Sequence, residues 1–352
     1  MRVLVTGHDG YIGSSLVPML RLGGHHVVGT DSGLFSDSAF CPPADTADVE
    51  LHVDVRDLRP EHFADVDAVV HLAALPDGPW DERGNGILSE INYRSTVHVA
   101  QMTRRTGVCR FVFSSSCSVY GPRGGTVVDE STEPAPMSSF ARAMALAERD
   151  VVELADHTFS PTFLRNTAVY GVSPRLRVDL TVNKLVGHAV ATGHVPLPNN
   201  GSDWLPSVHV EDVARAFLSV IEAPREVVHA KSYNVGRTDE SYRVCEIAAL
   251  VADVVGATVV SVGAAGTDPV DHGVGNRIDC SLIAAELPGF RAQWTVRRGI
   301  EELYDAYRQV GLTSKHLNGV QFQRYRHLRS LWGQGLVDAD LRHTAASESV
   351  GV

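Results

Sequence analysis

The sequence predicts an α/β fold built on a doubly wound parallel sheet, with a smaller mixed α/β region attached to it. Two observations predict the sheet. Short apolar runs alternate with longer segments whose apolar residues recur at helical spacing, and the first run leads directly into a glycine-rich loop that opens a helix. Alternation of this kind is typical of parallel strands joined by right-handed crossovers.

The first half of the chain supplies most of the predicted sheet. Because buried parallel strands are short and apolar throughout, five runs predict strands, at residues 3–6, 27–30, 68–72, 111–114 and 161–165. Segments between them carry apolar residues every three or four positions, which predicts helices at residues 14–22 and 92–105.

After residue 171 the pattern is less regular. It predicts helices at residues 180–192, 211–221, 242–254 and 297–310, a turn region at 195–201 and a strand at 233–235. We expect one domain over residues 1–171, to which 206–236 return, and a substrate-binding region over 172–205 and 237–310. Residues 311–352 predict a docked helical extension with a frayed end from Thr344.

Composition and charge exclude several classes of protein. The net charge of −11 over 352 residues argues against a nucleic-acid surface, which needs clustered Lys and Arg. The five cysteines form no CxxC pair and the sixteen histidines no HExxH spacing, so we expect neither a disulfide framework nor a metal site. The first apolar run is far too short for a signal segment or a membrane span. We expect a cytoplasmic protein without membrane or nucleic-acid partners.

The strongest local signal is a GxxGxxG loop between the first strand and the first helix. Gly7 permits the tight turn, Gly10 lets the backbone approach a pyrophosphate, and Gly13 lets the helix pack on the strand. The helix N-terminus then faces the phosphates. Asp31 ends the second strand, where a carboxylate accepts hydrogen bonds from ribose hydroxyls and repels a 2′-phosphate. The sequence therefore predicts a Rossmann-type domain with NAD as cofactor.

Over residues 1–310 the chain resembles the extended short-chain dehydrogenase/reductase family, the NAD-dependent epimerase/dehydratase group that acts on nucleotide sugars. The resemblance is carried by the glycine loop, Asp54-Val55, the HLAA run at 71–74 and the SSSCSVYG run at 114–121. It implies that further residues lie against NAD, namely Tyr11, Ile12, Asp54, Val55, Leu72, Ala73, Ala74, Asn92, Ser114 and Met144.

The resemblance also implies a substrate site and a homodimer. Ser116 occupies the position of the serine that hydrogen-bonds the reacting sugar hydroxyl, and Phe140 lies at a substrate position. Asn183 and Arg277 fall where the family places nucleotide-binding or structural motifs. As binding residues they would contact the nucleotide or phosphate end, because an amide and a guanidinium can both donate to phosphate oxygens, and the alternative is a structural role for both. Members of the family commonly dimerise through two helices per subunit, here about residues 92–105 and 140–155.

One departure from the family bears directly on the chemistry. The family places a Tyr-x-x-x-Lys pair after the serine strand, and this chain has Phe140 and Met144 at those two positions. Hydride removal from a carbinol requires a base for the hydroxyl proton. A phenol beside an ammonium serves as that base, whereas Phe140 carries no exchangeable proton and Met144 no charge. The loss is typically worth about 10²–10⁴-fold in rate.

Several side chains are candidates to replace the missing pair. Ser116, Cys117 and His209 are the catalytic candidates, with Tyr120 and Glu133 as further ones. Each also has a structural interpretation, since a tyrosine in this motif usually packs and a cysteine is more often a small buried residue.

Two functional hypotheses follow. One is an NAD-dependent enzyme that modifies a nucleotide sugar, or another phosphorylated metabolite, with a non-standard set of proton-transfer groups. The other is a non-catalytic or regulatory NAD(H)-binding protein, or a non-redox use of the scaffold.

Overall fold

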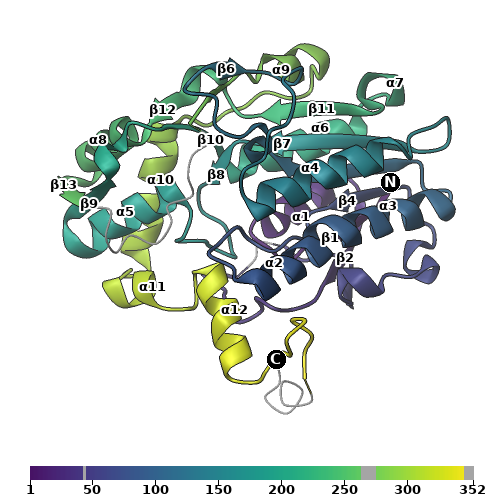
Figure 1. The fold of residues 1–352 in the computed structure, drawn as a ribbon, viewed down its shortest axis with the longest axis horizontal. Helices are drawn as coiled ribbons and strands as arrows, with labels where there is room; N and C mark the ends of the chain where they lie inside the picture. The colour runs from purple at the N-terminus through teal and green to yellow at the C-terminus, as the bar shows by residue number, and fades with distance from the viewer. Residues whose placement is uncertain (43–44, 263–274, 345–352) are drawn as a thin grey trace.

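The structure is a computed structural model that describes residues 1–42, 45–262 and 275–344. Its centre is a seven-stranded sheet in the order β11-β7-β5-β4-β1-β2-β3, and all neighbouring strands in it are parallel (Figure 1). The strands are β1 (Arg2–Thr6), β2 (His26–Asp31), β3 (Val49–His52), β4 (Ala68–His71), β5 (Arg110–Ser116), β7 (Ser160–Asn166) and β11 (Lys231–Val235). The predicted doubly wound parallel sheet is confirmed. Only β3 was not predicted, because its residues alternate between half-buried and exposed at the sheet edge.

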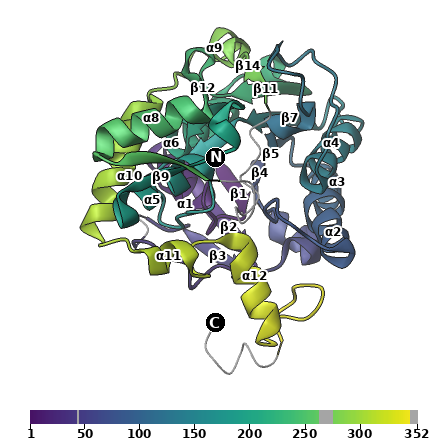
Figure 2. The same ribbon diagram turned by 60° about the vertical axis from the view of Figure 1, so that its left-hand side comes forward.

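Helices cover both faces of the sheet. On one side lie α1 (Gly13–Leu22) and α6 (Val210–Glu222), and on the other α2 (Glu82–Ser89), α3 (Ser95–Arg105) and α4 (Ser139–Val152) (Figure 2). Val3 and Val5 pack with the first pair, whereas Leu4 packs with the second group, because successive strand residues point to opposite faces. A π-helical turn (Glu90–Arg94) leads into α3, where the sequence predicted one continuous helix.

A second apolar cluster holds the smaller region together. It packs α5 (Thr181–Thr192), α8 (Val244–Val255) and α10 (Val296–Gln309), which lie on the side of the molecule away from α3 (Figure 1). Short strands complete this region, in the pairs β8 (Ala168–Tyr170) with β10 (Trp204–His209), β10 with β12 (Ser241–Arg243), β9 (His194–Pro198) with β13 (Thr258–Val262), and β6 (Val127–Val128) with β14 (Arg277–Ile278). Two short helices are α7 (Arg225–Val228) and α9 (Ser281–Glu286).

The predicted turn at 195–201 is corrected in part. Residues His194–Pro198 form β9, which pairs in parallel with β13 more than sixty residues later. Such pairing depends on a distant segment, so the prolines and asparagines alone favoured a turn. The turn itself follows at Asn199–Gly201.

The C-terminal extension is helical, as predicted, and docks on the main body. It consists of α11 (Ser314–Asn318), α12 (Arg324–Gly333) and a tail up to Thr344 (Figures 1 and 2). Its buried apolar side chains belong to the same cluster as α3 and α4, namely Leu328, Leu331, Val337 and Leu341. The frayed end predicted beyond Thr344 lies outside the described residues. Within the described ranges, no helix combines the length and the apolar character needed to cross a bilayer.

A buried ion pair ties α4 to the sheet. Arg165 on β7 donates from Nη2 to Glu148 Oε2 over 2.6 Å and from Nε to Glu148 Oε1 over 3.1 Å. The Ser115 hydroxyl also donates to Glu148, and Arg165 donates to the Tyr120 hydroxyl over 3.0 Å. Both charged side chains are buried, so each one neutralises the charge of the other away from water.

We expect Glu148→Ala to lower the free energy of unfolding by about 3–5 kcal/mol, because it leaves the Arg165 charge buried and unpaired. Urea unfolding followed by circular dichroism measures this. The control is Glu90→Ala, which removes an exposed pair with Arg94 and should cost at most about 1 kcal/mol. Equal losses in the two variants would contradict the account.

Candidate functional site

A cavity of about 780 Å³ opens at the carboxyl ends of the central strands. Its wall runs from the glycine loop after β1 to the ends of β2, β4 and β5 and the first turn of α4. It then continues into the smaller region at Leu205 and Pro206 of β10. Ligands of open parallel sheets bind at this edge. The volume falls within the range of small-molecule and cofactor sites.

The glycine loop meets β4 too closely for any side chain. A Cβ atom at Gly13 would lie 2.3 Å from the Gly7 carbonyl oxygen, and one at Gly7 would lie 2.8 Å from the Ala73 amide nitrogen. Gly7 also has a positive φ of 71°, which favours glycine. Helix α1 begins directly at the cavity, where the Ser14 amide donates to the Gly10 carbonyl over 3.0 Å and the Leu16 amide to the Ile12 carbonyl over 2.9 Å. Tyr11 and Ile12 line the cavity beside the three glycines.

Asp31 lies at the cavity wall at the end of β2. Its Oδ1 accepts from the Gly33 amide over 2.9 Å. Burial raises the pKa of the Asp31 carboxyl, and the Gly33 amide partly offsets that rise. A half-buried carboxylate with oxygen capacity to spare is suited to accepting from ribose hydroxyls.

Asp54 and Val55 also line the cavity after β3. The Asp54 carboxylate is occupied by Arg56, whose Nη2 donates to Oδ2 over 2.7 Å and whose Nε donates to Oδ1 over 2.9 Å. Arg56 thereby holds the Asp54 pKa below its usual range despite burial. The Asp54 carboxylate therefore already has a hydrogen-bond partner within the chain, Arg56.

The loop after β4 carries Leu72, Ala73 and Ala74 along the cavity. Asn92 does not lie on the cavity wall. Its buried amide accepts from the Leu75 amide over 2.7 Å and donates to the Leu75 carbonyl over 2.9 Å. The prediction that Asn92 contacts the cofactor is therefore corrected, because its side chain fastens this loop from behind.

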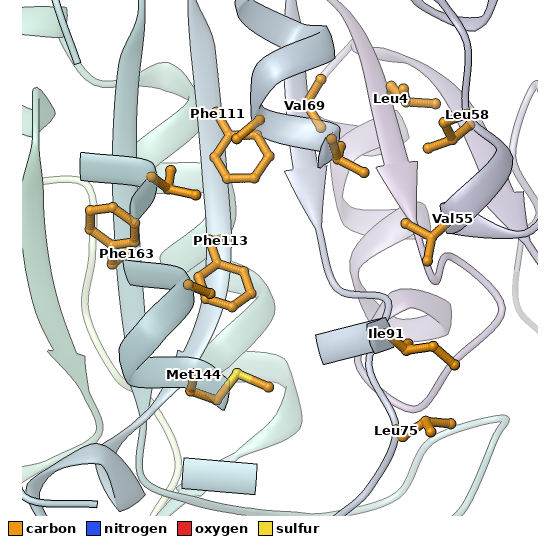
Figure 3. Packing of buried hydrophobic residues seen from close by; sticks show 14 of the residues in the cluster. Leu4, Val55, Leu58, Val69, Leu75, Ile91, Phe111, Phe113, Met144 and Phe163 are labelled. Carbon is orange, nitrogen blue, oxygen red and sulfur yellow. The ribbon is translucent and has the colours of Figure 1, made fainter. Parts of the chain in front are cut away.

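The far end of the cavity is largely apolar. Ser114, Ser116, Phe140 and Met144 line it. The two α4 residues are four positions apart, so they share one helix face. Met144 is buried in the cluster that includes Phe113 and Phe163, which Figure 3 shows near it. The Ser116 hydroxyl accepts from the Ser118 amide over 3.1 Å and can still donate its own proton.

Cys117 is corrected as a catalytic candidate. It is fully buried, lies outside the cavity wall, and its Sγ approaches the Arg165 carbonyl oxygen at 3.1 Å. Burial raises the pKa of the Cys117 thiol well above its usual value. A neutral, enclosed thiol is neither a nucleophile nor a base.

His209 is also corrected as a catalytic candidate. Its buried ring caps α6, stacks on Trp294 at 3.8 Å between centroids, and places Nε2 2.9 Å from Glu302 Oε2. It lies outside the cavity wall, as do the two further candidates. Tyr120 donates to Asn234 Oδ1 over 2.7 Å in the interior, and Glu133 is exposed.

The two residues predicted to contact a phosphate or nucleotide lie in different environments. Asn183 is buried, with Oδ1 accepting from the Gly171 amide and Nδ2 donating to the Arg177 carbonyl, both over 2.9 Å. It positions the chain before α5 without facing the cavity, which corrects the prediction. Arg277 is exposed outside the cavity wall, with Cζ 5.5 Å from the Trp204 ring centroid. Its part in ligand binding stays a prediction.

Several charged residues line the cavity that the sequence did not suggest. The charged ones are Arg177, Asp179 and Lys184 near the start of α5, and Arg324 and Arg326 of α12, beside the aromatic Tyr325. The available signal was the basic, aromatic character of the extension, which by itself says nothing about where the helix docks. Within the described ranges, no group of three or more His, Cys, Asp or Glu is arranged to hold a metal ion.

The comparisons with known proteins agree with this geometry. A model of the NAD dependent epimerase/dehydratase family matches residues 3–236. The chain is 31% identical over 242 residues to the 3-diazoavenalumate denitrifying reductase of a Streptomyces species, covering 63% of this chain and 73% of that protein. It is 29% identical over 283 residues to a UDP-glucose 4-epimerase of Mycolicibacterium smegmatis, covering 73% and 83%.

A solved structure, MoeE5 in complex with UDP-glucuronic acid and NAD, matches with a TM-score of 0.75 and 27% identity. The match covers 88% of this chain and 99% of that one.

We expect Asp31→Ala to weaken NADH binding by roughly ten- to hundredfold, because it removes charge-assisted hydrogen bonds worth about 1.5–3 kcal/mol. NADPH binding should change less, so the preference for NADH narrows. Fluorescence titration of both nucleotides measures this. Asp45→Ala, at an exposed position outside the cavity wall, is the control. An unchanged NADH affinity in Asp31→Ala would remove Asp31 from the site.

Proposed function

The chain belongs to the NAD-dependent epimerase/dehydratase family, and on that premise we propose that it transfers hydride between NAD and a nucleotide-linked sugar or similar phosphorylated metabolite. The observation that carries the proposal is the continuity of the cavity. One space extends from the glycine loop and Asp31 to Ser116, Phe140 and the β10 wall. A cofactor and a second ligand therefore have room to meet within it.

The cofactor half fits a dinucleotide. At Gly7 and Gly13 the backbone leaves no space for a side chain, so a pyrophosphate would lie against the glycine loop at the start of α1. Asp31 would accept from the ribose hydroxyls and disfavour a 2′-phosphate. When bound, NAD supplies the hydride acceptor or donor. The chain's own residues bind and orient it.

The substrate half is supported by the relatives and by Ser116. UDP-glucose and UDP-glucuronic acid appear in the names of matched proteins at 27–29% identity. Ser116 would donate a hydrogen bond to the reacting oxygen of the substrate, and Phe140 and Met144 would exclude water around it. Arg277, beside Trp204, is the proposed contact for a nucleotide or phosphate end.

The proton-transfer group is the unusual part of the proposal. Phe140 and Met144 cannot act as base, and Cys117 and His209 lie outside the cavity. Of the catalytic candidates from the sequence only Ser116 lines the cavity, and an unassisted hydroxyl is a weak base. We therefore propose that the substrate itself accepts or supplies the proton.

A second candidate function is a reductase that needs no base in the protein. The 31% identical relative is named a denitrifying reductase of a diazo compound. Hydride delivered from NADH to an electron-poor carbon that releases N₂ forms a C–H bond, breaks the C–N bond and consumes no separate proton. The apolar wall of Phe140, Met144 and Leu205 suits such an acceptor.

Assembly and location stay predictions. We propose a homodimer formed through α3 and α4, which lie side by side on the outside of the sheet (Figure 2). A cytoplasmic location is likewise proposed from the composition alone.

The proposed function is tested by identifying the dinucleotide released on denaturation and following nicotinamide absorbance with the intact protein. UDP-glucose and UDP-glucuronic acid are offered with NAD, and a diazo-substituted aromatic acid with NADH. We expect turnover with one class, reduced at least tenfold in Ser116→Ala. A folded protein that binds NADH but turns over neither class would support the non-catalytic alternative.

We expect Phe140→Tyr combined with Met144→Lys to create or raise dehydrogenase activity on a nucleotide sugar by about 10²-fold, since it restores the missing base. Initial rates of NADH formation measure this, with circular dichroism to verify folding. Phe140→Tyr alone is the control and should give less, because no ammonium then lowers the phenol pKa. No gain in the folded double variant would show that more than the base has changed.

A further inference from the structure

The C-terminal extension lies along the cofactor half of the cavity. Helix α12 reaches the loop after β2, where His327 Nε2 lies 2.9 Å from the Leu34 carbonyl oxygen. It reaches the loop after β4 through Tyr325, whose hydroxyl donates to the Pro79 carbonyl over 2.9 Å and whose ring meets Trp80 edge-on at 4.8 Å. The extension therefore spans the loops on both sides of β1, outside the residues that the family model matches.

One arginine of this helix is buried in the cavity wall. Arg324 is 4% exposed, and its guanidinium carbon lies 4.0 Å from the centre of the Phe35 ring. Nη2 donates to the Arg175 carbonyl over 3.3 Å. Nη1 is buried and has no hydrogen-bond partner among the described residues. A buried guanidinium with an unused donor is costly, so this position calls for an acceptor.

Two arginines near Arg324 are each paired with a carboxylate. Arg175 is paired with Asp9 of the glycine loop, Nε to Oδ1 at 2.9 Å, and Arg177 with Asp179, Nη2 to Oδ2 at 2.7 Å. Burial and the nearby Arg177 and Arg175 charges lower the pKa of Arg324 to about 9, although Asp179 and Asp31 oppose this shift. The cavity wall therefore includes the positive charge of Arg324, with which no carboxylate forms an ion pair among the residues that the structure describes.

We propose that the Arg324 guanidinium binds an anionic phosphate oxygen of the bound dinucleotide, so that the C-terminal extension completes the cofactor site. The proposal rests on the dinucleotide binding of the proposed function. A phosphate oxygen supplies both the missing acceptor and the missing negative charge, and a guanidinium is the side chain best matched to it. The pyrophosphate and a 2′-phosphate share this chemistry.

The test compares Arg324→Met, Arg324→Lys and the wild-type chain in fluorescence titrations with NADH. Loss of a charge-assisted hydrogen bond should weaken NADH binding in Arg324→Met by roughly ten- to hundredfold, and Arg324→Lys should recover part of it. Arg329→Met is the matched control, since Arg329 is exposed on the same helix and should leave the affinity within about twofold.

Further probes identify the phosphate. Adenosine binding should be equal in Arg324→Met and wild type, and ADP binding should fall as NADH binding does if the pyrophosphate is the partner. A larger loss for NADPH than for NADH would assign the 2′-phosphate instead. Binding of NADH and NADPH within twofold of wild type would overturn the proposal.

A second measurement separates binding from a structural role. Removing an uncompensated buried charge should leave the melting temperature of ligand-free Arg324→Met equal to or above that of wild type, while NADH raises it less than in wild type. A large drop in the ligand-free melting temperature together with unchanged affinity would overturn the proposal. A wild-type chain that binds no NADH would instead overturn the proposed function, and this inference with it.

Discussion

The site depends on one close backbone contact, between the glycine loop after β1 and the loop after β4. A Cβ atom at Gly7 would lie 2.8 Å from the Ala73 amide nitrogen, so the two loops meet with no intervening side chain. Within the glycine loop, a Cβ atom at Gly13 would lie 2.3 Å from the Gly7 carbonyl oxygen, and residues 72–74 continue along the cavity wall. Asn92 supports the same loop from behind through both of its amide groups.

The opposite end of the cavity is shaped by the spacing of residues along helix α4. In a helix, residues four apart share a face, so Phe140 and Met144 meet the cavity together. Met144 joins the apolar cluster under the sheet, where an ammonium would need a partner. The cavity thus combines a glycine loop and the Asp31 carboxyl at one end with the apolar side chains of Phe140 and Met144 at the other. Hydride transfer to an acceptor that needs no protein base is compatible with both ends.

The C-terminal extension contacts both the apolar cluster around Met144 and the loops around the cofactor half of the cavity. Its apolar residues anchor in the same cluster as Met144, and its polar residues reach the loops around the cofactor half. A helix held this firmly can present a buried cation at a fixed position, which a solvent-exposed arginine could not do.

Local rules in the chain were enough to predict the central strands, the helices at residues 14–22 and 92–105, and the part of the cavity near β1 and β2. Strand burial and helical spacing are periodic, and the glycine loop is contiguous, so no distant contact is needed to recognise them. Whether the side chains of Cys117, His209 and Asn183 reach the cavity depended on the direction in which each points. Contacts with Arg165, Trp294 and Gly171, respectively, set that direction. The contact of Arg324 with Phe35 could not be predicted from the sequence either. It joins residues nearly three hundred positions apart, and local sequence patterns do not indicate such a contact.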